Sequence, residues 1–175
     1  MYERFEWVLR TFADPYGREG VVRLYEPRDQ GPLLAMYAAL GADDGQAGAP
    51  RRGEAARRAW LERLAGHGIN AVGSLGGALA GHAALVPDGR HDCEIAVFVH
   101  PGFRRLGLGA ELARGVLGFA AECGFRRAWA AADAESPAAA RLAGRAGFAP
   151  RADGRWWTEL EPSPLYAKPL VARAR

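Results

Sequence analysis

One stretch, residues 93–124, constrains this chain more than any other, because it changes from one regular structure to another within a few residues. Residues 94–99 form an apolar run rich in β-branched and aromatic side chains, which predicts a strand buried on both faces. His100-Pro101-Gly102 ends that run. Beyond it the apolar residues recur with helical spacing, at Leu108, Leu112, Val116, Phe119 and Cys123. The chain therefore places a strand, a short turn and an amphipathic helix in direct succession.

The turn between this strand and this helix holds two arginines and two glycines, in the order Arg104-Arg105-Leu106-Gly107-Leu108-Gly109. A helix that begins at such a turn directs unpaired backbone N–H groups and its positive end at an anion. The glycines remove the side chains that would keep a phosphate away. The dinucleotide fingerprint needs a third glycine where Leu112 stands, and the P-loop needs Gly-Lys-Ser/Thr, which is absent. Both nucleotide motifs are disfavoured, and an R-x-x-G-x-G anion site remains.

This pattern resembles the coenzyme A pyrophosphate loop of the GCN5-related N-acetyltransferase (GNAT) superfamily, which reads Q/R-x-x-G-x-G/A. Arg104, Gly107 and Gly109 fill its fixed positions, and near residue 147 the chain reads A-x-R-L-A-x-x-A-G-F, similar to the family's A-x-x-L-Y-x-x-x-G-F. The resemblance covers residues 69–148. It implies an α/β fold in which a mixed, mostly antiparallel central sheet is flanked by helices on both faces, with acetyl-CoA as the acyl donor.

The resemblance also implies which residues contact coenzyme A. They are Phe98, Val99, Arg104, Arg105, Leu106, Gly107, Leu108, Gly109, Ala110 and Ser136. A backbone N–H near Phe98 or Val99, where family members carry a bulge, is expected to stabilise the oxyanion. In the family, the pantetheine arm lies between this strand and the next, which we expect at residues 126–132, because the two strands splay apart.

Acetyl transfer to an amine needs a group that accepts the amine's proton. Glu94 stands where the GCN5 branch carries its catalytic glutamate, and a carboxylate in an apolar strand should have a raised pKa. The alternative is that Glu94 only begins the strand in solvent, and both interpretations stay open. Ala143 replaces the family's frequent acid, a tyrosine, and Ser136 replaces its common asparagine, so no general acid is assigned. For His82, a packed and hydrogen-bonded role in a strand is favoured over a catalytic one.

The remaining pattern predicts one domain with a segment at each end: an N-terminal extension over 1–20, the acetyltransferase domain over 21–161 and a C-terminal tail over 162–175. Phe5, Trp7 and Leu9 alternate with their neighbours as in a short edge strand. Gly76-Gly77 predicts a β-hairpin. Further strands are expected at 21–25, 70–75, 78–86 and 155–160, and helices at 28–40, 54–65 and 136–147.

Composition bounds the class of protein. The chain has 175 residues, of which 49% are hydrophobic, enough for one domain with an adequate core. It shows neither a run long enough to span a membrane nor a signal peptide, so we expect a cytoplasmic protein without a membrane partner. Cys93 and Cys123 are interpreted as buried small hydrophobes without metal-ligand spacing, and no metal is expected. The basic residues lack interleaved aromatics, which argues against nucleic acid.

The sequence thus predicts an enzyme that moves an acetyl group from acetyl-CoA to an amine by direct attack, since no Ser, Cys and His form a recognisable nucleophile and base. The competing hypothesis is a non-catalytic acyl-CoA sensor or protein-interaction module, which the missing tyrosine favours. A basic nucleic-acid-binding domain is a remote third. The acceptor is a small-molecule amine or a protein lysine or N-terminus. We expect a homodimer, because the apolar N-terminal segment and Trp156-Trp157 exceed what a minimal domain must bury.

Overall fold

The computed structural model describes residues 7–40, 53–131 and 137–161, and these build one mixed sheet with the strand order β1-β2-β3-β4-β5-β6-β8-β7. All neighbouring strands are antiparallel except β5 and β6, which are parallel. The predicted mixed, mostly antiparallel sheet is therefore confirmed. Its strands are β1 (Val8–Ala13), β2 (Glu19–Leu24), β3 (Ile69–Leu75), β4 (Ala78–Pro87), β5 (Asp92–Val99), β6 (Arg127–Ala130), β7 (Ala149–Pro150) and β8 (Trp156–Glu159).

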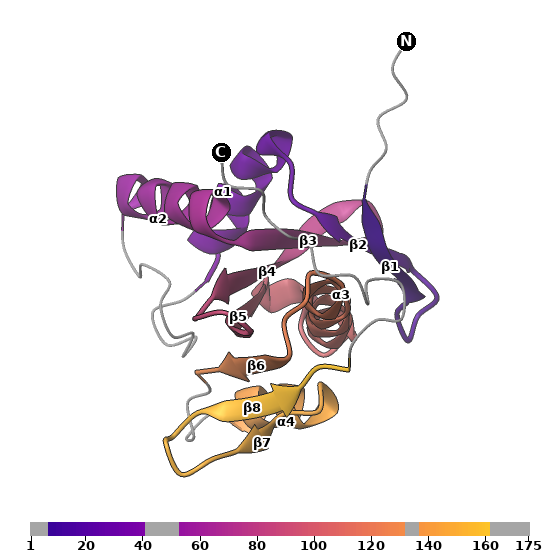
Figure 1. The fold of residues 1–175 in the computed structure, drawn as a ribbon. Coiled ribbons are helices and arrows are strands. Elements are labelled where there is room, and N and C mark those ends of the chain that lie inside the picture. Colours follow the sequence, from indigo (N-terminus) through magenta and orange to yellow (C-terminus); the bar gives the residue numbers. More distant parts are fainter. Residues whose placement is uncertain (1–6, 41–52, 132–136, 162–175) are drawn as a thin grey trace.

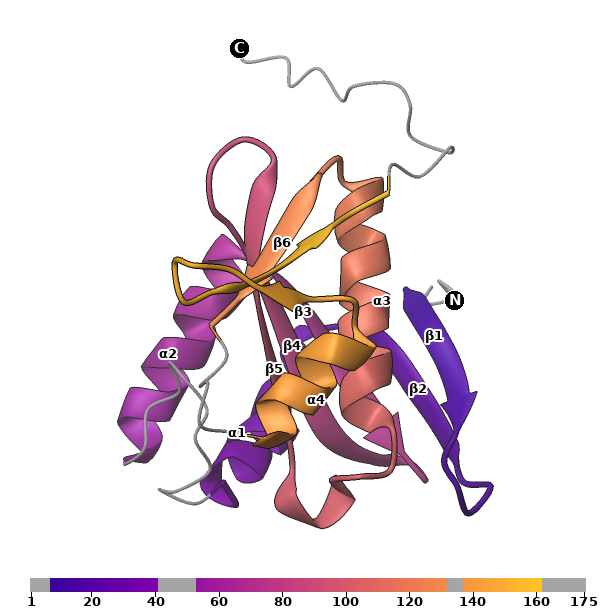
Figure 2. The same cartoon turned by 90° about the horizontal axis from the view of Figure 1, so that it is seen from below.

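Helices cover both faces of the sheet, as expected (Figures 1 and 2). On one face lie α1 (Gln30–Ala38), which follows a short 3-10 turn η1 (Pro27–Asp29), and α2 (Glu54–His67). On the other face lie α3 (Leu108–Glu122) and α4 (Pro137–Arg145), and a second 3-10 turn, η2 (Pro101–Phe103), leads from β5 toward α3. The sheet thus separates two hydrophobic clusters, one under each pair of helices.

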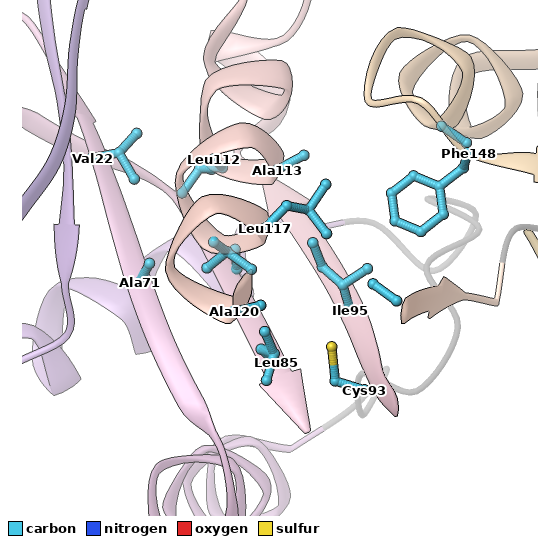
Figure 3. Packing of buried hydrophobic residues seen from close by; sticks show 14 of the residues in the cluster. Val22, Ala71, Leu85, Cys93, Ile95, Leu112, Ala113, Leu117, Ala120 and Phe148 are labelled. Carbon is cyan, nitrogen blue, oxygen red and sulfur yellow. The ribbon is translucent and has the colours of Figure 1, made fainter. Parts of the chain in front are cut away.

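The larger cluster fills the space between the sheet and α3 (Figure 3). Leu112 and Val116 of α3 are fully buried there. Two glycines of the sheet permit this close approach, since a Cβ built on Gly73 would lie 2.6 Å from Leu108 Cδ1, and one on Gly81 would lie 2.5 Å from Leu112 Cδ1. The first two turns of α3 therefore rest directly on β3 and β4. This contact fixes where the helix begins relative to the end of β5.

The smaller cluster joins α1 and α2 to the opposite face and is rich in aromatic rings. Tyr37 of α1 makes edge contacts with Trp60 of α2 and Phe98 of β5, at ring-centroid distances of 5.1 and 5.3 Å. Such edge-to-face pairs add about 0.5–1.5 kcal/mol each beyond the area they bury. Both helices are thereby packed against β5, the strand that precedes the glycine turn.

Most predicted elements are present within a few residues of their expected bounds. The short edge strand expected around residues 5–9 lies further along the chain, as β1, which pairs with β2. The prediction for Cys123 was wrong, because this residue is exposed. Helix α3 ends at Glu122, and its buried stripe follows steps of four residues to Ala120 rather than continuing to residue 123. The two-residue strand β7 was not predicted. Phe5 lies outside the described residues.

Candidate active site

Strands β5 and β6 pair over only three positions and then diverge. The parallel register joins Asp92–Glu94 to Arg127–Trp129, although β5 continues to Val99. Strand β6 turns its other edge to β8, so the inner edges of β5 and β6 face a gap that opens beyond Glu94. This divergence agrees with the splayed strands that the family resemblance implied (Figure 1). Apart from the Val99 carbonyl, which accepts from Arg104 Nε, the backbone groups of β5 along the gap have no strand partner among the described residues and can pair with an extended ligand.

The hydrogen-bond alternation of β5 decides which N–H groups face this gap. The His100 N–H donates to the Ala80 carbonyl over 2.8 Å, and the register next to it is Gly81 with Val99 and residue 82 with Phe98. In an antiparallel ladder, successive residues turn their N–H groups to opposite edges. The Phe98 N–H therefore points toward β4 and the Val99 N–H toward the gap. Of the two expected oxyanion donors, the geometry favours Val99.

The expected bulge does not lie in β5. Its register with β4 runs without a shift from Val99 to Cys93. The irregularity lies one strand away, where Gly73 pairs with residue 81 but Ser74 pairs with Leu79, so that Ala80 of β4 is the extra residue. A bulge gives one strand an unpaired residue and bends it. In this chain it is therefore β4, not β5, that bends at the end of the sheet nearest the glycine turn.

The glycine turn lies where β5 ends. The Arg104 side chain folds back, and its Nε donates to the Val99 carbonyl over 3.3 Å. Arg105 has a φ of 65° and Gly107 a φ of 91°, left-handed conformations that bring the chain abruptly into α3. Around Gly107 an added Cβ would meet nothing within 4 Å, whereas one on Gly109 would lie 3.3 Å from Val99 Cγ2. The first glycine keeps the backbone open, and the second allows the helix to pack against β5.

This turn presents backbone rather than side chains. The first N–H groups of a helix have no intrahelical acceptor, and here they are those of Leu108 and Gly109, since the Ala110 N–H donates to the Gly107 carbonyl over 3.0 Å. The side chains of Leu108 and Ala110 are buried, with 1% and 9% of their surface exposed. Leu106 is half-buried and Arg105 exposed. The turn therefore offers an anion the main chain of a helix N-terminus, with arginine side chains beside it.

Glu94 lies where the gap closes, at the last paired position of β5, opposite Trp129 of β6. Its side chain is half-buried, so the interpretation of a fully solvated residue does not hold. Burial raises the pKa of Glu94; Arg155 lowers it, and Asp88 raises it further. Val99 lies five positions beyond Glu94 in β5, about 16 Å along an extended strand. A proton moving between the two ends of this segment needs an intermediate carrier such as water.

His82 takes no part in the gap. It is 1% exposed, and burial lowers its pKa to about 3, so the ring is neutral. Its Nε2 lies 3.0 Å from Asn70 Oδ1, and its Nδ1 lies 2.6 Å from the Tyr37 hydroxyl. The Asn70 amide donates to the carbonyls of Leu64 and Gly68, so Oδ1 is an acceptor and His82 Nε2 carries the proton. Tyr37 then donates to Nδ1, which leaves His82 no lone pair for catalysis.

The structure yields no tyrosine acid for the leaving thiol in the part of the chain that it describes. Ala143, at the family's tyrosine position, is buried in the larger cluster. Tyr37 is buried with a raised pKa, and Tyr16 is exposed at the far turn between β1 and β2. Tyr25 follows β2, which β3 and β4 separate from β5, and burial together with Asp29 and Glu62 raises its pKa. Ser136 and Tyr166 lie outside the described residues.

Three residues next to Glu94 escaped the sequence analysis: Asp88, Trp129 and Arg155. Trp129 Nε1 donates to Asp88 Oδ2 over 2.8 Å, and the Arg155 guanidinium carbon lies 4.1 Å from the centre of the Trp129 ring. The three are far apart in sequence and match no local motif. Only the register of β5 with β6, and of β6 with β8, brings them together.

Residues 33–148 match the model of the acetyltransferase (GNAT) family. This range begins in α1 and ends just after α4, so it contains the gap, the glycine turn and Glu94. Among curated protein sequences, none matches the chain significantly.

Solved structures share the fold at low sequence identity. The GNAT domain of S. lividans PAT superposes with a TM-score of 0.74 at 19% identity, over 91% of this chain and 100% of that one. RimL, a ribosomal L7/L12 α-N-protein acetyltransferase in complex with coenzyme A, gives 0.74 at 11% identity over 89% and 99%. The putative acetyltransferase yncA from Salmonella typhimurium, with acetyl-CoA, gives 0.62 at 22% identity over 83% and 96%.

None of the helices in residues 7–40, 53–131 and 137–161 combines the length and the apolar character that crossing a membrane requires. Within these ranges there is also no group of three or more His, Cys, Asp or Glu side chains placed to hold a metal ion.

Proposed function

The chain belongs to the GNAT acetyltransferase family, and on that premise we propose that it transfers an acetyl group from acetyl-CoA to an amine by direct attack. The observation that carries the proposal is the gap between β5 and β6, which ends at the glycine turn on one side and at a half-buried carboxylate on the other. The reaction needs an anion site, an unpaired strand edge and a base, and these three features follow one another along the gap.

In this proposal acetyl-CoA supplies the activated acyl group and the turn binds its pyrophosphate. The left-handed Gly107 leaves the backbone open to a phosphate, and the N-terminus of α3 adds its positive end. The edge of β5 pairs with the amide groups of the pantetheine arm. The N–H of Val99, which faces the gap, donates to the carbonyl oxygen on which negative charge develops.

Glu94 acts as the base through water. The amine nitrogen forms a bond to the acyl carbon, the C–S bond breaks, and the amine's surplus proton passes along water to the carboxylate. Its half-buried position supports this role, because a base works best when its pKa lies near the working pH and burial shifts the pKa of Glu94 upward. The thiolate leaves without a protein acid or takes a proton from water.

Replacing the base tests the mechanism. Glu94→Gln should lower kcat by about 10²-fold or more and leave the Kd for acetyl-CoA nearly unchanged, since general-base catalysis contributes about 10²–10⁴. Glu122→Gln, near the end of α3, is the matched control and should retain full activity. If Glu94→Gln is as active as the parent, the base is elsewhere.

The acceptor is proposed as an amine, either on a small molecule or on a protein lysine or N-terminus. An acetyl-CoA consumption assay against polyamines, amino acids, aminoglycosides and lysine peptides identifies the class. The competing function, a sensor that binds acyl-CoA without turnover, has the absence of a described tyrosine acid in its favour. Tight acetyl-CoA binding without turnover on every member of the panel would favour the sensor.

We also propose a homodimer that uses the open edge of β1. Trp7 and Val8 are 67% and 50% exposed beside this edge, whereas Leu9 lies against α3. The ring of Trp157 contacts the guanidinium groups of Arg127 and Arg151. Light scattering at micromolar concentration should give twice the chain mass, and Trp7→Glu should lower it; a monomeric parent would refute the dimer.

Both cysteines are free thiols, which supports the proposed cytoplasmic location.

A further inference from the structure

The side chains around Glu94 come from three separate parts of the chain. Asp88 lies in the turn between β4 and β5, Trp129 is in β6, and Arg155 stands directly before β8. Trp129 and Trp157 are register partners, so Arg155, two residues before Trp157, turns its side chain to the same face. Glu94 is the register partner of Trp129 and projects from that face as well.

The main chain holds Arg155 firmly in a tight turn. Its N–H donates to Asp153 Oδ1 over 3.0 Å, and its carbonyl accepts from the Arg151 N–H over 2.8 Å. From this anchored position the side chain extends over the indole of Trp129. The stacking distance of 4.1 Å is well within the range of a favourable cation–π contact. The guanidinium therefore occupies a defined position on the Trp129 ring, beside Glu94.

Asp88 lies beside both the Trp129 ring and the Arg155 guanidinium. Its Oδ2 accepts the Trp129 Nε1–H over 2.8 Å and lies 3.9 Å from Arg155 Nη1. The indole thus lies between a carboxylate at its edge and a guanidinium on its face. Glu94 interacts electrostatically with one charge of each sign, and both of these charged groups contact the Trp129 ring.

We propose that Arg155 is a positioning residue which, seated on Trp129, keeps the Glu94 carboxylate ionised and ready to accept the acceptor's proton. The proposal rests on the role of Glu94 given above and adds the residue that regulates it. Burial raises the pKa of Glu94 most; Arg155 lowers it and so favours the charged form, whereas Asp88 raises it and opposes that form.

Other groups that border Glu94 are neutral or compensate one another. Val86 faces it from β4, and Asp92 on its own strand is held by Arg127 through two hydrogen bonds of 2.8 and 2.6 Å. The ring of Trp157 has its own pair of guanidinium groups, those of Arg127 and Arg151. Arg155 is thus the guanidinium that stacks on the ring next to Glu94.

Three variants separate this role from a structural one. Arg155→Met keeps the aliphatic length over the indole and removes the charge. Asp88→Asn keeps an oxygen that accepts from Trp129 and removes the opposite charge. Arg151→Met is the matched control, because it removes a guanidinium that is stacked 5.1 Å from Trp157 and not on Trp129.

Two measurements are made on each full-length variant: the Glu94 titration by carboxyl ¹³C NMR, assigned with Glu94→Gln, and the pH profile of kcat/KM. We expect Arg155→Met to move both midpoints to higher pH, Asp88→Asn to move both to lower pH, and Arg151→Met to leave both in place. The amine acceptor titrates in the same way with every variant, so its effect on the pH profile of kcat/KM cancels when the variants are compared.

The two measurements distinguish the ways of failing. If Arg155→Met leaves the NMR midpoint of Glu94 unchanged, the positioning role is overturned, whatever the activity of the enzyme. If the NMR midpoint moves while the rate profile stays fixed, Glu94 is not the base, and Arg155 has no positioning role in the reaction even though acetyl transfer stands. A shift of equal size in Arg151→Met would show a general charge effect and overturn the proposal too.

Discussion

His82 makes the stability of this protein depend on pH in a way that can be calculated. The ring is buried, and its pKa falls from 6.5 to about 3 because burial disfavours the charged form. Unfolding returns it to its ordinary pKa, so the unfolded chain binds a proton that the folded chain refuses. Stability from this group is complete above pH 6.5 and is lost as the pH falls from there toward 3.

The magnitude follows from proton linkage. For one group with these two pKa values, lowering the pH from 7.5 to 5 removes about 2 kcal/mol from the free energy of unfolding. The carboxylates whose pKa is lowered, Asp29 among them, lose their contribution only at more acidic pH. The pKa of Glu94 is raised in the folded state, so this group increases the free energy of unfolding as the pH falls. Its contribution is the same in the parent and in the two variants described next, and it cancels when they are compared.

Urea unfolding at pH 7.5 and 5 in the parent, His82→Gln and Tyr37→Phe measures the effect. In His82→Gln the titrating ring is gone, so about 2 kcal/mol of the pH dependence should disappear. That variant should also lose about 1–3 kcal/mol at pH 7.5, because the buried Tyr37 hydroxyl loses its acceptor. Tyr37→Phe keeps the buried ring and should keep the pH dependence.

The change in unfolding free energy between pH 7.5 and 5, compared across the three proteins, tests whether His82 is neutral in the folded state. Equal changes in unfolding free energy between pH 7.5 and 5 for the parent and His82→Gln would mean that His82 is not held neutral in the folded state. A pH dependence lost in Tyr37→Phe as well would mean that the hydroxyl, and not burial, keeps the proton off the ring.

Three further predictions concern packing, binding and pH. Gly81→Ala should destabilise the fold by about 1–3 kcal/mol in urea, because its Cβ would meet Leu112, whereas Gly118→Ala, with open space around it, should be neutral or stabilising. Gly107→Val should weaken acetyl-CoA binding about tenfold or more in calorimetry, since the branched side chain blocks the turn and strains a φ of 91°. Without a tyrosine acid, kcat/KM should rise to a plateau with no falling limb below about pH 10; a descending limb would reveal another acid, with Tyr166 tested first.

Local sequence was sufficient for the elements and for the turn. The strand ending at Val99, the hairpin at Gly76-Gly77 and the helix from Leu108 each depend on periodicity or on residues adjacent in the chain. The short strand β7 and the exposure of Cys123 were missed. A two-residue strand has no periodicity to detect, and the end of a helix depends on capping geometry more than on its apolar pattern.

The sequence by itself determined that a glycine turn joins a strand to a helix and that a carboxylate lies in that strand, because these relations involve neighbours along the chain. The tertiary structure decided the environment of that carboxylate and therefore its pKa. Whether Glu94 is buried, whether His82 is neutral and which N–H of β5 faces the gap depend on register between strands. Arg155 reaches Glu94 only through Trp129 and β8, across about sixty residues of chain, and electrostatic and packing forces act over distances in space that sequence spacing does not record.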